Sequence, residues 1–355
     1  MKTFSLPTVV DEAVRRKAAD ILLVSGCRPA LKVEAKLVQL DQFAVLDDGD
    51  IKTVVEAILP KSKSKDLEEN RQVDLAYERG KDRFRVNIFY QRGHLSVVMR
   101  YVQATVPDID SLGLPGITKD LLENDNGLIL MVGPTGSGKS TSLASMLQYI
   151  NRTFEKHIIT IEDPVEYVYE NDKSIIQQRE LGTDANSFPD ALRAALREAP
   201  DIIMLGEMRD LESVAAAITV AETGHLVLST VHANNAAGTI DRIIDIFPAG
   251  YKEQVRIQLA DILLAVFNQR LVPKVDGSGL QMICEVMLAN SAVRNAIRTN
   301  NAAQLPNIIQ TSAQEGMYLL DDLLVKAARL GQISKDTALA FANDRVEVRK
   351  GLSAN

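Results

Sequence analysis

A glycine-rich loop that ends in a lysine is the stretch of this sequence best suited to chemistry. Residues 133–140 read GPTGSGKS and fit the pattern G-x-x-x-x-G-K-[ST]. In such a loop, backbone N–H groups surround the β-phosphate of a nucleotide, the lysine contacts the β- and γ-phosphates, and the serine ligates Mg²⁺. We expect these roles for Lys139 and Ser140. The residues predicted to bind the nucleotide are Gly133, Pro134, Thr135, Gly136, Ser137, Gly138, Lys139, Ser140 and Thr141.

A glutamate after a second apolar run is a candidate catalytic carboxylate. Hydrolysis of a bound nucleotide needs a group that orients water and groups that stabilise charge on the γ-phosphoryl. Glu207 ends the run IIMLGE, where a second nucleotide motif commonly lies, with Gly206 in place of the usual aspartate. We therefore expect Glu207 to polarise the attacking water. The plainer alternative is an ion pair between Glu207 and Arg209.

A second acidic group follows the apolar run ITI. In the segment ITIEDPVEY, Glu162, Asp163 and Glu166 come directly after a predicted strand, which Pro164 must end. In open α/β sheets, ligands bind at the carboxyl ends of strands. These carboxylates are therefore predicted to hold the magnesium shell or the attacking water. The alternative is a solvated acidic turn.

Two histidines flank a third apolar run in the segment ETGHLVLSTVHAN. A histidine at a strand end can donate a hydrogen bond to a phosphate and so respond to the γ-phosphate. His232, at the carboxyl end beside Ser229 and Thr230, is the better sensor. His225, at the amino end, is the candidate for packing or an interface, and a single histidine is more often structural.

The elements that must position these residues are short apolar strands separated by helices. The runs LILMV, HIITIE, IIMLGE and HLVLSTV are almost wholly apolar, which indicates a parallel sheet covered on both faces. Helical spacing marks residues 187–199, with Ser187 as a cap, and residues 210–223, which end at Gly224. We assign residues 118–290 to this nucleotide-binding core.

The flanking regions have different patterns. Residues 83–101 alternate apolar and polar side chains around the turn QRGH, which predicts an antiparallel hairpin within a small α+β domain, residues 1–103. Proline and glycine in residues 104–117 indicate a linker. Residues 291–355 show only helical periodicity, and the tail after about 345 is expected to fray.

Composition excludes several classes. The net charge is −7, which argues against a surface built for nucleic acid, so no nucleic-acid partner is expected. The two cysteines, Cys27 and Cys284, lie far apart and predict neither disulfides nor a zinc site. The start of the chain lacks the features of a signal peptide, and no apolar run is long enough to span a membrane. We expect a soluble cytoplasmic protein.

The motifs together resemble a known group. GPTGSGKST, IITIEDPVEY, ALREAPDIIMLGEMRD and AETGHLVLSTVHAN, in this order, resemble the secretion ATPase superfamily and, within it, the PilT-type retraction ATPases of type IV pili. The resemblance implies an N-terminal PAS-like domain, a RecA-like ATPase domain with a mainly parallel sheet, and a homohexameric ring that uses ATP with Mg²⁺. It places Glu162 and Glu166 in the acidic box, Glu207 in the Walker B region, and His225 and His232 in the histidine box.

The resemblance also suggests a role for a basic ridge. Residues 79–100 hold six basic residues and one acid, Asp82. In this family two arginines fifteen residues apart reach the nucleotide of a neighbouring subunit, and Arg85 and Arg100 have that spacing. An arginine supplied in trans stabilises charge in the transition state. The alternative is a solvated basic face.

Retraction is favoured over assembly, because assembly relatives usually carry a four-cysteine zinc motif that two cysteines cannot build. Residues 292–299, AVRNAIRT, keep Arg294, Asn295, Ile297 and Arg298 of a retraction motif, but an ordinary amphipathic helix is also possible. Leu22 replaces an expected histidine, so a paralogue of the retraction motor stays open.

The implied protein is a motor at the cytoplasmic face of the inner membrane, peripheral to it. It would act through a membrane platform protein, with a second retraction ATPase as a further partner. A related secretion or conjugation ATPase, or a weakly hydrolysing regulatory ring, are the alternatives.

Overall fold

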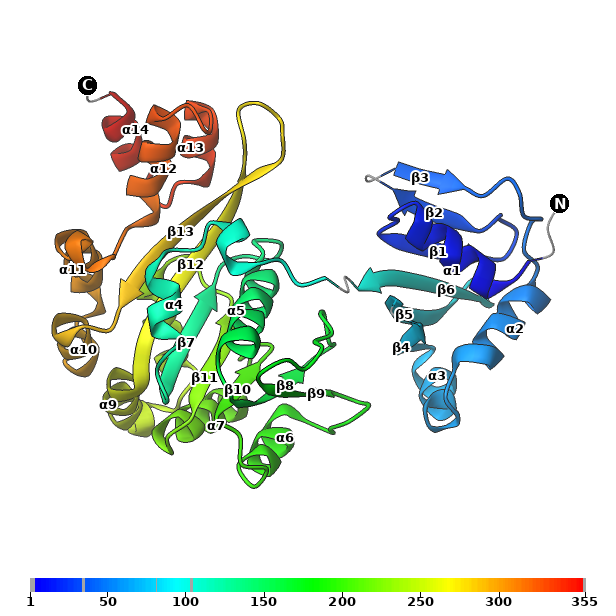
Figure 1. The fold of residues 1–355 in the computed structure, drawn as a ribbon, viewed down its shortest axis with the longest axis horizontal. Helices are drawn as coiled ribbons and strands as arrows, with labels where there is room; N and C mark the ends of the chain where they lie inside the picture. The colour runs from blue at the N-terminus through cyan, green and yellow to red at the C-terminus, as the bar shows by residue number, and fades with distance from the viewer. Residues whose placement is uncertain (1–3, 34–35, 81, 103–104, 354–355) are drawn as a thin grey trace. The chain divides into compact units, whose positions relative to one another are not determined.

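The computed structural model describes residues 4–33, 36–80, 82–102 and 105–353 (Figure 1). The chain divides into two compact units, Met1–Thr105 with Glu166–Val168, and Val106–Val165 with Tyr169–Asn355. Each unit has its own hydrophobic core.

The N-terminal unit is an antiparallel sheet covered by helices. Its strands run in the order β3-β2-β1-β6-β5-β4 among the described residues. The predicted hairpin is β5 and β6, whose register runs from Arg83 opposite Val102 to Gln91 opposite His94. The elements are α1 (Leu6–Arg15), β1 (Asp20–Val24), β2 (Ala30–Val33), β3 (Lys36–Gln39), α2 (Asp48–Ile58), α3 (Ser64–Asn70), β4 (Gln72–Arg79), β5 (Asp82–Gln91) and β6 (His94–Val102).

The alternation of β5 decides which of its faces is buried. Phe84, Val86 and Ile88 are fully buried, because alternate residues of a strand point to the same side of the sheet. They join side chains of α1 and α2 in one core. Arg85, between Phe84 and Val86, is therefore on the opposite, exposed face of the sheet.

The second unit is built on a larger sheet, with strand order β13-β12-β7-β11-β10-β8-β9 in the described chain. All neighbouring pairs are parallel except β12 and β13. The predicted fold class, an N-terminal α+β domain before a P-loop domain with a mainly parallel sheet, is confirmed. The strands are β7 (Gly127–Val132), β8 (His157–Glu162), β9 (Ile175–Glu180), β10 (Ile202–Leu205), β11 (Leu226–Val231), β12 (Leu263–Pro273) and β13 (Leu280–Leu288).

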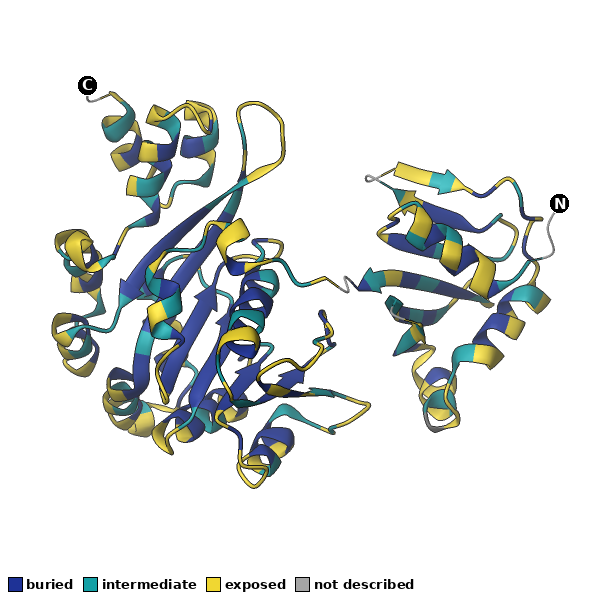
Figure 2. Cartoon of the chain, in the orientation of Figure 1, coloured by how far each residue is buried: buried dark blue, intermediate teal, exposed yellow. Residues whose placement is uncertain are grey.

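Helices cover both faces of this sheet, which explains why its central strands are apolar throughout. β7, β10 and β11 are buried along their whole length (Figure 2). Leu128, Leu130 and Val132 pack in one core, whereas Ile129 and Met131 pack in the core on the other face. The helices are α4 (Ile117–Leu121), α5 (Lys139–Thr153), α6 (Phe188–Ala195), α7 (Leu211–Glu222), α8 (Ala236–Asp245) and α9 (Lys252–Ile262).

The end of the chain is helical, as its periodicity indicates. It forms α10 (Ser291–Arg298), α11 (Leu305–Thr311), α12 (Leu320–Arg329), α13 (Lys335–Phe341) and α14 (Arg345–Ser353). The expectation of a frayed tail is wrong for residues 345–353. α14 buries Val348 completely in a small core with Leu324, and Arg329 donates to the carbonyl oxygen of Gly351. Across the described ranges, the helices lack the length and apolar character needed to cross a membrane.

Candidate functional site

The glycine-rich loop joins β7 to α5. β7 ends at Val132 and α5 begins at Lys139, so the loop has the strand and helix that its motif requires. Gly136 and Gly138 have φ values of 78° and 86°, in the left-handed region that favours glycine. The middle of the loop, residues 134–136, is exposed to solvent. The loop is therefore both shaped for phosphate and open to it.

The groups around Lys139 suit a magnesium nucleotide. Lys139 is 8% exposed, and its Nζ donates to the carbonyl oxygens of Gly133 and Pro134 at 2.9 and 3.1 Å. Within the described residues, α5 has neither a side-chain cap nor an acid in its first turn, so its N-terminal dipole favours an anion. Ser140, the next residue, carries a hydroxyl of the kind that can ligate Mg²⁺. The described residues hold no cluster of three or more His, Cys, Asp or Glu that could bind a metal.

Three of the remaining candidates lie at the same edge of the sheet as this loop. β11 is the neighbour of β7, β10 the neighbour of β11, and β8 the neighbour of β10, all parallel. Because parallel strands end at the same edge, His232, Glu207 and Glu162 follow one another beside the loop. This edge is where open α/β sheets bind ligands.

Glu207 and His232 are paired directly. His232 Nε2 lies 3.1 Å from Glu207 Oε1, and Arg209 Nε donates to Glu207 Oε2 at 2.7 Å. The Glu207 side chain is 16% exposed, and the pKa of Arg209 is raised by this hydrogen bond. The ion pair with Arg209 thus exists together with a second contact that the sequence did not predict. Both oxygens of the Glu207 carboxylate are therefore held in place, one by His232 and the other by Arg209.

Backbone contacts fix the segment that carries Glu207. Thr230 Oγ1 donates to the carbonyl oxygen of Gly206 at 2.7 Å, and Met208 N donates to that of Thr230 at 3.0 Å. Gly206 replaces the usual aspartate, and a Cβ there would lie 3.5 Å from the Cα of Glu162. Glu207 is therefore held at the end of β10 by β11.

The two acidic-box glutamates have different environments. Glu162 is buried at the end of β8, and its Oε1 accepts from Thr160 Oγ1 at 2.6 Å and from Gln178 Nε2 at 3.1 Å. Glu166 and Asp163 are exposed on the segment that follows. Glu162 is therefore a bonded carboxylate at the edge of the sheet, whereas Asp163 and Glu166 are accessible to solvent.

The two histidines lie at opposite ends of β11. His225 precedes the strand, where its Nδ1 lies 3.1 Å from the carbonyl oxygen of Val220 and 3.2 Å from Thr223 Oγ1. His232 follows the strand at the same edge as the phosphate loop. The structure brings His232 to the site and keeps His225 at the far end of the sheet.

Arg85 and Arg100 form a separate group on the N-terminal unit. They pair across β5 and β6 and line a shallow depression of about 370 Å³ with Asp20, Asp74, Asn87 and Val98. Arg100 Nε donates to Asp20 Oδ1 at 2.8 Å, and Arg85 Nε lies 3.8 Å from Asp74 Oδ1. Lys81 of the predicted basic ridge lies outside the described residues.

Sequence reasoning missed a buried polar cluster on β12 and β13. Asn268, Gln269, Arg270 and Glu285 are each less than a tenth exposed. Asn268 Nδ2 donates to Glu285 Oε2 at 2.7 Å, and both Asn268 and Arg270 donate to the carbonyl oxygen of Asn234, two residues after His232. The signal was the polar run NQR inside an apolar strand, since buried polar side chains need partners.

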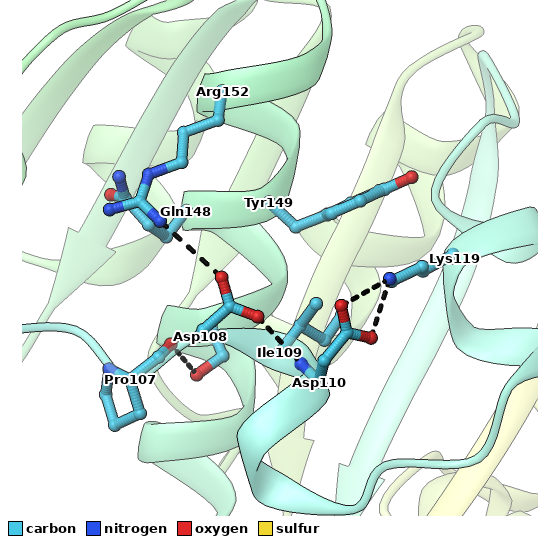
Figure 3. A pocket seen from close by; sticks show the side chains of 9 residues that line it. Pro107, Asp108, Ile109, Asp110, Lys119, Gln148, Tyr149 and Arg152 are labelled. Atoms are coloured by element: carbon cyan, nitrogen blue, oxygen red, sulfur yellow. Dashed lines mark hydrogen bonds and ion pairs between the residues drawn. The ribbon is translucent and has the colours of Figure 1, made fainter.

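A cavity of about 210 Å³ lies where the first residues of this unit pack on α5 (Figure 3). Ser145 Oγ donates to the carbonyl oxygen of Pro107 at 2.7 Å, and Arg152 Nη1 lies 3.6 Å from Asp108 Oδ2. Ile109 is buried in the core beneath α5. The segment 107–112 is therefore attached to the helix that starts at the phosphate loop.

A phosphate loop on a parallel sheet, with carboxylate and imidazole groups at the same edge, defines a P-loop ATPase. The family model described as type II/IV secretion system protein matches residues 8–337. The chain belongs to this family and is an ATPase, so the resemblance drawn from its motifs is confirmed.

The chain is similar over most of its length to ATPases of type IV pili. The chain is 41% identical to the type IV pilus retraction ATPase PilT of Pseudomonas aeruginosa, over 92% of this chain and 94% of that protein. It is 38% identical to the type IV pilus ATPase PilU of the same organism, over 95% and 88%. The crystal structure of the pilus retraction motor PilT with bound ADP superimposes with a TM-score of 0.92 at 43% identity, covering 98% of this chain and 99% of that one.

Proposed function

We propose that the protein is a motor of type IV pilus retraction, which binds ATP with Mg²⁺ at residues 133–141 and hydrolyses it. The observation that carries the proposal is the contact between Glu207 and His232 beside the phosphate loop. Lys139 holds the β- and γ-phosphates and Ser140 ligates Mg²⁺. Glu207 orients the attacking water, His232 responds to the γ-phosphate, and Glu162 and Glu166 serve the magnesium shell or the water.

The working form is a homohexameric ring. Arg85 and Arg100 of one subunit enter the nucleotide site of a neighbour and stabilise charge in the transition state. Their exposure on one face of the N-terminal sheet supports this role, because an arginine acting in trans must be accessible. The near-complete coverage of PilT by this chain supports retraction as the output.

Attachment of segment 107–112 to α5 supports a coupling route. α5 begins at Lys139, so a change of the loop on nucleotide binding or hydrolysis moves the helix and the segment with it. That segment lies within the predicted linker, residues 104–117, whose residues from Val106 onward belong to the second compact unit. We propose that it carries motion from the ATPase core, residues 118–290, to the N-terminal domain, residues 1–103. The helical region 291–355 follows the core.

The partner that receives this motion is an inner-membrane platform protein, which the ring contacts from the cytoplasm as a peripheral protein. A second retraction ATPase is a further proposed partner. The chain has a similar sequence identity to PilT and to PilU, which supports the proposal that it works together with a second ATPase of the same kind. No nucleic acid is involved.

The proposal is tested with Lys139→Ala and Glu207→Gln, each purified and each returned to the chromosome. We expect ATP turnover to fall about 10²–10⁴-fold for Glu207→Gln, the range for loss of a positioned base. Cells should carry excess pili yet fail to twitch, because pili extend without being withdrawn.

Glu222→Gln is the matched control, since it makes the same change at the far end of α7, where Glu222 accepts a hydrogen bond from Gln258. Its turnover and twitching should equal wild type. Normal turnover in both site variants would overturn the enzymatic reading. Loss of pili, instead of excess pili, would indicate assembly.

A further inference from the structure

Gln269 lies beside the start of the phosphate loop. β12 runs parallel to β7, and Asn268 is the register partner of Val132, the residue before Gly133. The Gln269 side chain is 1% exposed. A buried amide needs partners at both of its ends, and those partners show what it organises.

Both ends of the Gln269 amide are bonded to the nucleotide-binding element. Nε2 donates to the carbonyl oxygen of Ser137 at 2.6 Å, and Oε1 accepts from Ser142 Oγ at 2.8 Å. A carbonyl oxygen can only accept, so the NH₂ end must face Ser137. One side chain thus joins the middle of the loop to the first turn of α5.

Two loop glycines leave room for Gln269. A Cβ at Gly138 would lie 2.8 Å from Gln269 Nε2, and a Cβ at Gly133 would lie 2.5 Å from the Gln269 carbonyl oxygen. By contrast, a Cβ at Gly136 would meet nothing within 4 Å. The loop is therefore in close contact with Gln269 at both of its ends.

We propose that Gln269 is a positioning residue that holds the phosphate loop in its nucleotide-binding shape. Its side-chain amide is bonded to Ser137 and Ser142. It fixes the carbonyl of Ser137, and through Ser142 it fixes the register of α5 against the loop. The inference rests on ATP binding at the loop and is independent of pilus retraction.

The test measures affinity, using Gln269→Leu, Gln269→Glu and Ser142→Ala with mant-labelled ADP at pH 8, below the unfolding temperature of each variant. Leucine fills similar space but leaves the Ser137 carbonyl oxygen without its donor. We expect the Kd to rise about tenfold, which is about 1.4 kcal/mol. Glutamate keeps the size of glutamine, but an ionised carboxylate cannot donate, so its Kd should rise at least as much.

The Ser142→Ala variant removes only the hydrogen bond from Ser142 to Gln269 and should raise the Kd about threefold. This variant still tests the proposal if Gln269→Leu does not fold. The KM for ATP should follow the Kd while kcat stays within about threefold, because the lost interaction supports ground state and transition state alike. A residue that only fills the core would lower the melting temperature and leave the Kd of the folded protein unchanged.

Gln258→Leu is the control, because it removes a glutamine that donates to Glu222 on the surface of the same unit. It should leave the Kd unchanged. Values within twofold of wild type for Gln269→Leu, Gln269→Glu and Ser142→Ala would overturn the inference. A wild-type protein that fails to bind the probe would instead contradict the ATPase function itself.

Discussion

Arg85 and Arg100 occupy directly opposite positions on adjacent antiparallel strands, so their guanidinium groups stand on one face of the N-terminal sheet. Asp20, which is opposite Arg100 on β1, is buried and bonded to it. Two like charges side by side repel, and the aspartates offset this repulsion. The two arginines are therefore held side by side on one face of the sheet, each next to an aspartate.

If the pair acts on a neighbour's nucleotide, Arg85→Ala and Arg100→Ala should each lower ATP turnover by about 10³–10⁵-fold, the range for a lost arginine finger. Rings mixed from Arg85→Ala and Lys139→Ala subunits should regain turnover, because some sites then combine an intact Lys139 with an intact Arg85. Steady-state ATPase assays over a range of mixing ratios would measure this recovery.

The control for the arginine prediction is Arg79→Ala. Arg79 is also a β-strand arginine of this unit, and it is bonded to Asp11 at 2.7 and 2.9 Å. Its loss should leave turnover within twofold of wild type. Mixed rings that stay inactive at every ratio would count against action in trans.

A second prediction concerns His232. Because it contacts Glu207 and not the phosphate loop, His232→Ala should lower kcat about 10²-fold and leave the KM for ATP within about threefold. The matched variant is His225→Ala, at the other end of the same strand, which should keep kcat within twofold. Equal losses in both variants would show that the effect comes from β11 as a whole.

A third prediction concerns pH. Burial, together with the nearby charge of Asp321, raises the pKa of Glu285 from an ordinary 4.5 to about 7. Hydrogen bonds from Asn268 and Ala236 and the charge of Arg270 lower the pKa but do not cancel the effect of burial. Between these values the folded protein keeps a proton that the unfolded chain has released. The contribution of Glu285 to the free energy of unfolding is therefore full below pH 4.5 and is lost as the pH rises to about 7.

Urea unfolding at pH 5 and pH 8 measures this contribution. Glu285→Gln keeps an oxygen to accept from Asn268 and Ala236 but cannot ionise. Relative to wild type, this variant should gain about 3 kcal/mol in free energy of unfolding between pH 5 and pH 8, as an order of magnitude. A difference between the two proteins that does not change with pH would contradict the shifted pKa.

The sequence predicted the elements whose signals are local. The phosphate loop, the hairpin of β5 and β6, and the positions of Glu207 and His232 at strand ends all follow from short runs of residues and their periodicity. Glu162 shows the limit of that approach. The Glu162 carboxylate is bonded to Thr160 and to Gln178, which lies on β9. β9 was not predicted, because its residues QQR are polar and do not resemble a buried strand.

The residues that sequence reasoning missed depend on contacts between distant parts of the chain. Gln269 and Ser137 are 132 residues apart, and they meet only because β12 lies next to β7. Glu285 is buried because β13 adds to the edge beyond β12 and the C-terminal helices cover it. The frayed tail was a wrong expectation for the same reason, since Val348 finds its partners on α12.

The last prediction concerns the attachment of segment 107–112 to α5 (Figure 3). The double variant Ser145→Ala and Arg152→Ala removes a hydrogen bond and an exposed ion pair, which together stabilise the attachment by about 1–2 kcal/mol. ATP turnover should stay within about threefold, because neither side chain touches the loop, whereas twitching should fall sharply. The matched control, Lys156→Ala, removes another exposed ion pair of the same unit, with Asp125, and should change neither. Parallel loss of turnover and twitching would mean that the contacts support the ATPase site, whereas normal twitching would mean that motion reaches the N-terminal domain by another route.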